Sequence, residues 1–173
     1  MKKPATLALV ALLAAAVSMS GDSVALSQSA CTGNGVQTGR LVIGTPGHDF
    51  INCKGSTIDL IIIGLDGNDW LEGGDGNDFI SGGPGNDIVI SRGGRDVIQG
   101  GPGRDFLAAG PGNDVLRGGP GDDLLFGGSG DDVLFGGDGD DDLIGGDGMD
   151  LCDGQDGKGD SADRSCEIPA HVP

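Results

Sequence analysis

A nine-residue phrase repeats through about half of this chain. It reads GGDGNDFIS at residues 73–81 and GGPGNDIVI at residues 82–90. Counted from Gly64, the frame continues to Asp153 without an insertion or deletion and gives ten units. A repeat this short predicts a solenoid, because one unit cannot bury its apolar residues alone and must stack on its neighbours.

Three places of the repeat keep one residue type in all ten units, which chance does not produce. The eighth place is apolar throughout, from Leu71 in the first unit to Cys152 in the last. The fourth place is always glycine: Gly67, Gly76, Gly85, Gly94, Gly103, Gly112, Gly121, Gly130, Gly139 and Gly148. The sixth place is always aspartate: Asp69, Asp78, Asp87, Asp96, Asp105, Asp114, Asp123, Asp132, Asp141 and Asp150.

These columns predict a coil that is built from two units. Glycine allows the backbone to turn through positive φ and to approach a ligand closely. The last three residues of a unit are β-prone and long enough for a short strand whose middle side chain points to one side. Turn, strand, turn and strand then complete one coil, and the eighth-place residues of two opposed sheets meet inside it. We therefore expect an all-β fold.

The aspartates of such a solenoid need a cation. Units n and n+2 would lie in adjacent coils, about 4.8 Å apart. At that spacing two carboxylates repel by about 0.9 kcal/mol in bulk water, and several-fold more strongly at a protein surface. Calcium accepts about six to eight oxygens in flexible geometry, from carboxylates and peptide carbonyls, whereas magnesium requires a stricter octahedron. The pattern therefore favours calcium between successive turns.

The overall composition agrees with a fold that depends on a cation. The 173 residues include 37 Gly, 5 Phe, 1 Trp and no Tyr, so a conventional core is not expected. The formal net charge of −17 disfavours nucleic acids and anionic membranes as partners. An acidic chain that is poor in aromatic residues is also typical of disorder. Disorder is therefore the alternative interpretation, above all for the chain without calcium.

The phrase GGxGxDxUx, repeated in this way, resembles the repeats-in-toxin (RTX, hemolysin-type) calcium-binding nonapeptide. The resemblance implies a right-handed parallel β-roll with two nonapeptides per coil. It also implies several calcium ions, held by the sixth-place aspartates together with turn carbonyls around the fourth-place glycines. The degenerate unit GTPGHDFIN at residues 44–52 adds Asp49 to these candidate ligands. The ten turns form two rows of five, and each row has four gaps between successive turns, which predicts up to about eight ions.

The N-terminal residues have the features of a secretory signal. Lys2 and Lys3 precede an apolar run from Ala5 to Val17, which is shorter than a membrane span of about 20 residues. We expect cleavage after Ala25 and a secreted, extracellular, bacterial protein without a membrane span. The rest of the chain then divides into an N-terminal cap with degenerate repeats at residues 26–63, the roll at 64–153 and a C-terminal cap at 154–173.

Four cysteines flank the repeats, at Cys31, Cys53, Cys152 and Cys166. An even number in an exported chain implies two disulfides, with three possible connectivities. The local pairs Cys31–Cys53 and Cys152–Cys166 are favoured because each pair brackets one end of the repeats. A zinc site is the alternative, but no two cysteines have CxxC spacing.

Some turns depart from the glycine pattern. Glycines of the first or second place are replaced at four positions: Leu65, Ser91, Arg92 and Ala109. In addition, Arg95 and Arg104 directly precede two of the candidate ligands. These arginines have two interpretations. Their fixed positive charge weakens the calcium sites of these units, or their side chains point outward and pair with neighbouring acids.

Acidic side chains also follow the last repeat. They are Asp153, Asp156, Asp160 and Asp163. This segment lacks the spacing of an EF-hand loop. It could hold one further calcium ion, or it could form a polar C-terminal cap that is closed by a disulfide.

The outward places of alternate units differ in polarity. In the odd-numbered units most seventh- and ninth-place residues are apolar: Trp70, Ile88, Ile90, Phe106, Ala108, Leu124, Phe126 and Ile144. An apolar outer face predicts contact with a protein partner, a second copy or a surface. The alternative is that these residues only reflect the β-propensity of an exposed ribbon.

The sequence lacks the common catalytic motifs. It contains no nucleophile elbow, no HExxH helix and no phosphate-binding loop that leads into a helix. We therefore predict a secreted calcium-ion-binding protein that is not an enzyme and whose roll folds on binding calcium. The alternative function is an extracellular adhesive or structural surface module in which calcium is only structural.

Overall fold

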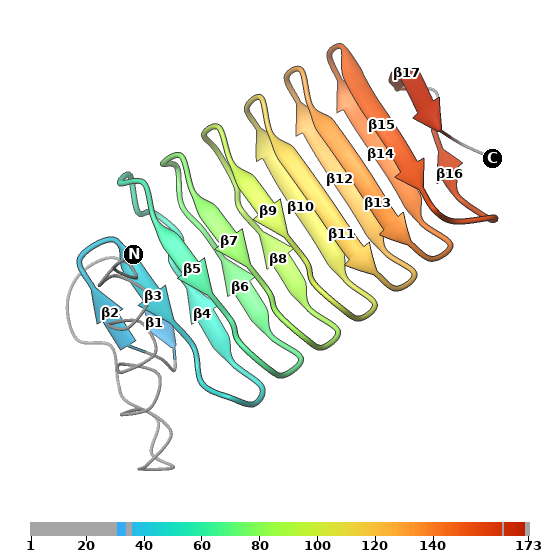
Figure 1. Ribbon diagram of the computed structural model, residues 1–173. Coiled ribbons are helices and arrows are strands. Elements are labelled where there is room, and N and C mark those ends of the chain that lie inside the picture. The colour runs from blue at the N-terminus through green and yellow to red at the C-terminus, as the bar shows by residue number, and fades with distance from the viewer. Residues whose placement is uncertain (1–30, 34–35, 164, 172–173) are drawn as a thin grey trace, which may run out of the picture.

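The computed structural model describes residues 31–33, 36–163 and 165–171. This part of the chain contains seventeen β-strands and no helix, and the strands stack along one axis from the N-terminal to the C-terminal end (Figure 1). The described residues accordingly include no helix that is long and apolar enough to cross a membrane. The predicted secretory signal at residues 1–25 lies outside them.

The strands form two sheets. The eight-stranded sheet contains, in spatial order, β1 (Thr32–Gly33), β4 (Phe50–Asn52), β6 (Trp70–Glu72), β8 (Ile88–Ile90), β10 (Phe106–Pro111), β12 (Leu124–Ser129), β14 (Asp142–Asp147) and β16 (Ser161–Ala162). The nine-stranded sheet contains β2 (Val36–Thr38), β3 (Leu41–Ile43), β5 (Ile61–Ile63), β7 (Phe79–Ser81), β9 (Val97–Gln99), β11 (Val115–Pro120), β13 (Val133–Asp138), β15 (Asp150–Gln155) and β17 (Cys166–His171). From β4 onward the chain alternates between the sheets, so two strands complete one coil.

Adjacent coils pair in parallel and keep one register through the repeats. Leu107 of β10 lies opposite Val89 of β8 on one side and opposite Leu125 of β12 on the other. Paired residues are therefore two nonapeptides apart in the sequence. This arrangement confirms the predicted all-β solenoid with two nonapeptides per coil.

The strands of the C-terminal half are longer than the repeat predicts. The last three places of each unit form β4 to β9, as expected, but β10 to β15 each span six residues. In these strands the pairing continues through the second-place glycines, for example between Gly110 and Gly128. The turns of the C-terminal half are correspondingly shorter.

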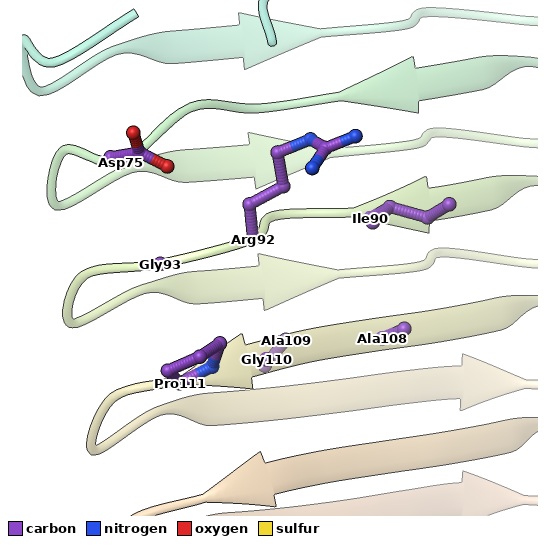
Figure 2. Close-up of a pocket in the computed structure, with 8 residues that line it drawn as sticks. All are labelled: Asp75, Ile90, Arg92, Gly93, Ala108, Ala109, Gly110 and Pro111. Atoms are coloured by element: carbon purple, nitrogen blue, oxygen red, sulfur yellow. The ribbon is translucent and has the colours of Figure 1, made fainter. Parts of the chain in front are cut away.

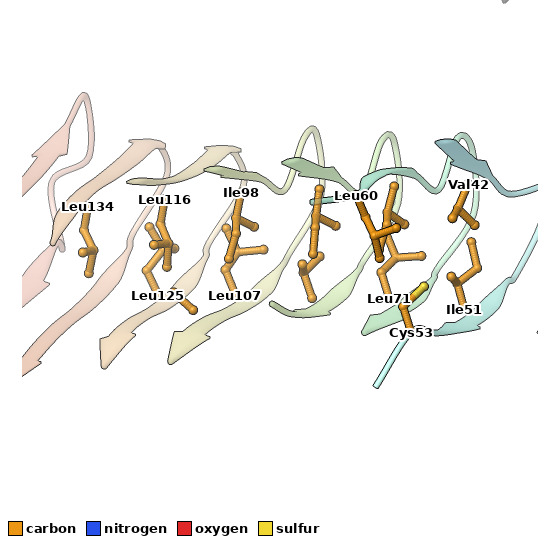
Figure 3. Close-up of a cluster of buried hydrophobic side chains, with 14 of the residues drawn as sticks. Val42, Ile51, Cys53, Leu60, Leu71, Ile98, Leu107, Leu116, Leu125 and Leu134 are labelled. Carbon is orange, nitrogen blue, oxygen red and sulfur yellow. The ribbon is translucent and has the colours of Figure 1, made fainter. Parts of the chain in front are cut away.

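The eighth-place side chains form the core in two facing rows (Figure 3). Each of them is at most 1 % exposed, and together they fill the space between the two sheets. Burying one such aliphatic side chain stabilises the fold by about 2 kcal/mol. One row contains Ile51, Leu71, Val89, Leu107, Leu125 and Leu143, and the other contains Val42, Ile62, Ile80, Ile98, Leu116, Leu134 and Cys152.

The fourth-place glycines allow the turns to stack closely. A Cβ on Gly103 would lie 1.7 Å from the carbonyl oxygen of Gly85 in the preceding coil, and Gly103 has a φ of +147°. No other residue type fits a position with both properties. The invariant fourth-place glycine is thus required by the contact between coils.

Both ends of the roll differ from its middle. At the N-terminal end β1 and β2 run antiparallel to β4 and β3 and cover the first coil. At the C-terminal end β17 pairs with β15 through an irregular register. Disulfides join Cys31 to Cys53 and Cys152 to Cys166, the two local pairs that were favoured from the sequence. Each disulfide thus ties a terminal segment to the adjoining coil.

Candidate metal centre

The sixth-place aspartates lie in two columns, one along each row of turns. Within a column, the backbone N–H of one aspartate donates a hydrogen bond of 2.7–3.0 Å to Oδ1 of the aspartate in the next coil. We call the two columns the first and the second ladder. The first ladder contains Asp49, Asp69, Asp87, Asp105, Asp123, Asp141 and Asp160, and the second contains Asp78, Asp96, Asp114, Asp132 and Asp150.

The second carboxylate oxygen, Oδ2, lacks a hydrogen-bond partner in most of these residues. It is buried and receives no hydrogen bond from the described part of the chain in Asp69, Asp87, Asp96, Asp105, Asp114, Asp123, Asp132, Asp141, Asp150 and Asp160. Buried polar atoms are normally satisfied, and an ionised one without a partner is strongly unfavourable. Ten such oxygens in two regular rows therefore indicate that a ligand belongs beside them.

Eight of the ten open oxygens face a small gap that glycine leaves free, whereas the turns of Asp96 and Asp114 begin with Ser91 and Ala109. A Cβ on Gly64, the first-place residue of its turn, would lie 2.3 Å from Asp69 Oδ2 and 2.5 Å from the carbonyl oxygen of Gly82 in the next coil. We call this gap, between Oδ2 and the first-place carbonyl of the next coil, a cradle. A first-place carbonyl thus borders this cradle, and the fourth-place carbonyls face the fourth-place glycine of the next coil.

Burial makes these carboxyls hard to ionise in the chain without metal. Desolvation is the largest cause, and neighbouring aspartates of the same ladder add to it. The pKa also rises from its ordinary value near 4 for Asp49, Asp78 and Asp87. The pKa is raised to about 7 for Asp69, Asp105, Asp114 and Asp123, and to about 6 for Asp96, Asp132 and Asp141.

The donor set of a cradle fits a hard divalent cation. Among the described residues, no three His, Cys, Asp or Glu side chains converge on one point that could hold a metal ion. A cation beside Asp69 Oδ2 would therefore need peptide carbonyls such as that of Gly82 to complete its ligands. Calcium accepts such mixed oxygen sets in flexible geometry, and magnesium does so less readily. Soft metals, which prefer thiolate ligands, do not suit an all-oxygen site.

Both ladders are closed at their N-terminal ends. Oδ2 of Asp49 accepts a hydrogen bond of 2.6 Å from Thr45 N–H, and Oδ2 of Asp78 accepts one of 2.9 Å from Gly74 N–H. In the coil before Asp78, Leu60 takes the position that an aspartate has elsewhere in the ladder. Its N–H donates to Asp78 Oδ1, and its side chain is buried. The first turn of each ladder is thus satisfied by the chain itself.

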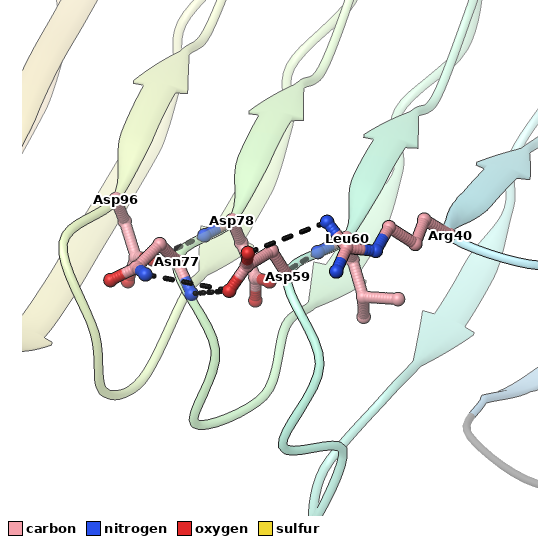
Figure 4. A network of polar contacts seen from close by, with 6 residues as sticks. All are labelled: Arg40, Asp59, Leu60, Asn77, Asp78 and Asp96. Carbon is pink, nitrogen blue, oxygen red and sulfur yellow. Dashed lines mark hydrogen bonds and ion pairs between the residues drawn. The ribbon is translucent and has the colours of Figure 1, made fainter.

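A second, exposed set of hydrogen bonds runs beside the ladders and was not predicted from the sequence. At the fifth place, the side-chain oxygen of one residue accepts the backbone N–H of the fifth-place residue in the next coil. Asp59 accepts from Asn77, and Asn77 accepts from Arg95 (Figure 4). The signal was present in the repeat, since its fifth place is mostly Asn or Asp. Arg95 and Arg104 have exposed side chains.

The structure also places Asp160 in the first ladder. Asp141 N–H donates to Asp160 Oδ1 over 3.0 Å, and a Cβ on Gly154 would lie 2.4 Å from Asp160 Oδ2. The sequence separation between Asp141 and Asp160 is nineteen residues rather than eighteen. This single inserted residue hides Asp160 from a strict nine-residue frame.

Comparison with known proteins agrees with this geometry. The sequence matches the RTX calcium-binding nonapeptide repeat in four copies, at residues 61–89, 90–125, 99–134 and 117–152. A search of curated proteins found no relative. The four copies together cover residues 61–152, which is more than half of the 173 residues. The chain therefore belongs to the family of proteins with RTX calcium-binding nonapeptide repeats, and its β-solenoid is that of a calcium-binding protein.

Proposed function

We propose that this chain is a secreted calcium-ion-binding protein whose roll folds when several calcium ions enter the cradles. The observation that supports the proposal most strongly is the set of ten buried Oδ2 atoms without a hydrogen-bond partner in the described chain. The proposed ligands are the aspartates of the two ladders, Asp49 and Asp78 included, together with turn carbonyls. These turn carbonyls are those around the fourth-place glycines and the first-place carbonyls that border the cradles, such as that of Gly82 beside Asp69.

Folding without a cation is strongly disfavoured near neutral pH. Keeping a carboxyl such as Asp105 ionised in the fold, when its pKa lies at about 7, costs roughly 4 kcal/mol relative to the unfolded chain. Several aspartates share this environment, and the net stability of a domain is only about 5–15 kcal/mol. A bound divalent cation supplies the positive charge that offsets this cost. The chain's own residues contribute the cage, since Oδ1 holds the coils together and Oδ2 faces the cradle.

Secretion is supported by the disulfides and by the N-terminal sequence. Disulfides persist in oxidising compartments outside the cytoplasm, and the structure contains two of them. Lys2, Lys3 and the apolar run that follows have the composition of a secretory signal. A roll that folds only in millimolar calcium would stay unfolded in a calcium-poor cytoplasm before export.

Calcium titration of the full purified chain tests the proposal. After removal of metal, the far-ultraviolet circular dichroism spectrum should be that of an unfolded chain, and added calcium should restore a β spectrum. Magnesium at the same concentration should have much less effect, because it tolerates the mixed cradle geometry poorly. An unchanged, compact β spectrum in excess chelator would contradict the proposal.

A second candidate function is an extracellular adhesive or structural surface module. Large apolar side chains are exposed near the N-terminal end, including Phe50 at 50 %, Ile61 at 44 % and Trp70 at 40 %. The rings of Phe50 and Trp70 lie 6.2 Å apart on the outer face of the eight-stranded sheet. Such a face suits contact with a protein or a surface.

Sedimentation with insoluble cell-wall material, in calcium and in chelator, tests this second function. The double variant Phe50→Ser/Trp70→Ser should lose binding to that material and keep its calcium stoichiometry. Equal sedimentation of this variant and the unmodified chain would count against an adhesive role for this face.

A further inference from the structure

The two ladders differ at the residue that borders each cradle. In the first ladder that residue is always glycine, from Gly44 to Gly154. In the second ladder the turns of Asp96 and Asp114 begin instead with Ser91 and Ala109. Because a Cβ on Gly64 would lie only 2.3 Å from Asp69 Oδ2 and would clash with it, the side chains of Ser91 and Ala109 must change the cradle itself.

The Ser91 side chain lies beside a carbonyl oxygen of its cradle. Ser91 is completely buried, and its Oγ donates a hydrogen bond of 3.1 Å to the carbonyl oxygen of Ala109 in the next coil. That carbonyl corresponds to the carbonyl of Gly82 beside Asp69. A side chain with a neutral hydroxyl thus already lies beside this carbonyl, at the place that glycine leaves free in most other turns.

The Ala109 methyl group closes the next cradle in the same ladder. Ala109 is 1 % exposed and belongs to the buried apolar cluster. Its Cβ stands at the position that must stay vacant at Gly64 and Gly82. This turn therefore has less space for a cation.

The Arg92 side chain is also charged and lies in the same turn as Ser91, but it forms an ion pair away from the cradle. Figure 2 shows Arg92, which replaces a second-place glycine, at the edge of a cavity of about 400 Å³ that also borders Ala109 and Gly110. The Arg92 guanidinium pairs with Glu72 in a neighbouring strand rather than with Asp96. The Asp96 cradle thus has the Ser91 hydroxyl beside it and no ion pair with Arg92.

From this geometry we infer that Ser91 and Ala109 close two cradles, so that the two ladders bind calcium unequally. The first ladder binds along its whole open length, from Asp69 to Asp160. The second ladder binds only at its C-terminal end, beside Asp132 and Asp150, where glycine returns at the first place. This inference rests on the proposed calcium-binding function.

Calcium stoichiometry of two isosteric variants tests the inference. Asp105 and Asp114 occupy equivalent positions in the first and second ladder, and Oδ1 of each accepts one backbone N–H, over 2.8 Å and 2.7 Å respectively. Asparagine preserves that oxygen and replaces Oδ2. By native mass spectrometry in millimolar calcium, Asp105→Asn should lose at least one ion per chain and Asp114→Asn should lose none.

Two further variants change the cradle rather than the ligand. Ala109→Gly should gain one ion per chain, because it restores the space that Gly64 provides. Gly100→Ala should lose at least one, because its new Cβ would lie 2.3 Å from Asp105 Oδ2. The circular dichroism spectrum in calcium shows for each variant whether the roll is folded before ions are counted.

The outcomes separate this inference from the proposed function. If the unmodified chain binds no calcium, the proposed function fails. If it binds calcium but Asp114→Asn loses as many ions as Asp105→Asn, or Ala109→Gly gains none, the inference is overturned and the proposed function stands.

Discussion

The backbone N–H of Asp105 donates a hydrogen bond of 2.8 Å to Oδ1 of Asp123, which lies one coil further along the roll. The other oxygen of Asp123, Oδ2, is buried without a hydrogen-bond partner in the described chain. One carboxylate therefore has two tasks: Oδ1 joins adjacent coils and Oδ2 faces a cradle. A cation in that cradle would therefore be held by the same side chain that joins the two coils.

This double role predicts a large effect from a single amide substitution. Asp123→Asn keeps an oxygen for the Asp105 N–H but places a neutral amide at the cradle. We expect the calcium concentration at the folding midpoint to rise at least about threefold, since a charge-assisted ligand worth more than about 0.7 kcal/mol is lost. Circular dichroism during calcium titration measures the midpoint.

Asp122→Asn is the matched control for Asp123→Asn. Asp122 is adjacent in sequence but exposed, and its Oδ1 accepts the Asp140 N–H at the fifth place over 3.1 Å. Asparagine can accept the same hydrogen bond, so the midpoint should stay within experimental error. Equal shifts of the calcium midpoint in the two variants would show that the change in net charge, and not the place of the carboxylate at a cradle, raises the midpoint.

The raised pKa values predict that acid stabilises the roll when metal is absent. The folded pKa of Asp69 and Asp123 is about 7, above an unfolded value of about 4. Folding therefore takes up protons, and this contribution to stability is fully present below about pH 4 and is lost as pH rises through 6 to 7. Metal-free protein, prepared by dialysis, should show more β signal by circular dichroism at about pH 5 than at about pH 8.

The same linkage predicts that protons compete with calcium. Apparent calcium affinity should fall as the pH is lowered from about 8 to 6, because the cradle carboxyls must lose their protons to bind the ion. Light scattering of each sample excludes aggregation near the isoelectric point of about 4.1. A metal-free β signal and a calcium affinity that are both constant from about pH 5 to 8 would show that the buried carboxyls do not titrate as expected.

The contact between fourth-place glycines predicts a position where alanine is not tolerated. In Gly103→Ala the new Cβ would lie 1.7 Å from the Gly85 carbonyl oxygen, so the coils must separate. Gly47 has nearly the same φ, +148° against +147°, but nothing within 4 Å of its Cβ position. Both variants share the backbone strain, and only Gly103→Ala adds the clash. Denaturation in saturating calcium should show about 1–3 kcal/mol more destabilisation for Gly103→Ala than for Gly47→Ala.

Leu65 offers a test of stored backbone strain. It has a φ of +88° at a second place, where the repeat usually has glycine. The left-handed conformation disfavours any side chain with a Cβ by about 1–2 kcal/mol. Leu65→Gly should therefore be more stable than Leu65→Ala by about 1 kcal/mol in urea denaturation with calcium present. Equal stability of the two variants would show that the surrounding turn adapts without strain.

Most of the fold follows from the repeat, because its period fixes both the strands and their register. The last three places of the units form β6 to β9 as expected, and the eighth-place residues form the core as expected. Strand length was less predictable. Whether Gly110 continues the pairing of β10 depends on the neighbouring coil, and a single unit of sequence does not contain that information.

The candidate site was predictable in its residue types but not at its ends. An unbroken frame identifies Asp105 and its equivalents, whereas an insertion displaces Asp160 from that frame. The replacement of an aspartate by Leu60 is likewise hidden behind a two-residue insertion, Cys53 and Lys54. That Asp78 Oδ2 is held by Gly74 N–H depends on the turn conformation, which the sequence pattern does not specify. The domain boundaries and the full ligand set stay predictions.

The insertions have a consequence for how the chain finds its correct alignment. Because the repeats are nearly identical, a strand that pairs one coil too early or too late would still form both ladders and both apolar rows. The spacing of twenty residues between Asp49 and Asp69, against eighteen further along, fits only one alignment. The irregular first coil, which the disulfide Cys31–Cys53 joins to the N-terminal segment, thus fixes the register of the turns that follow it.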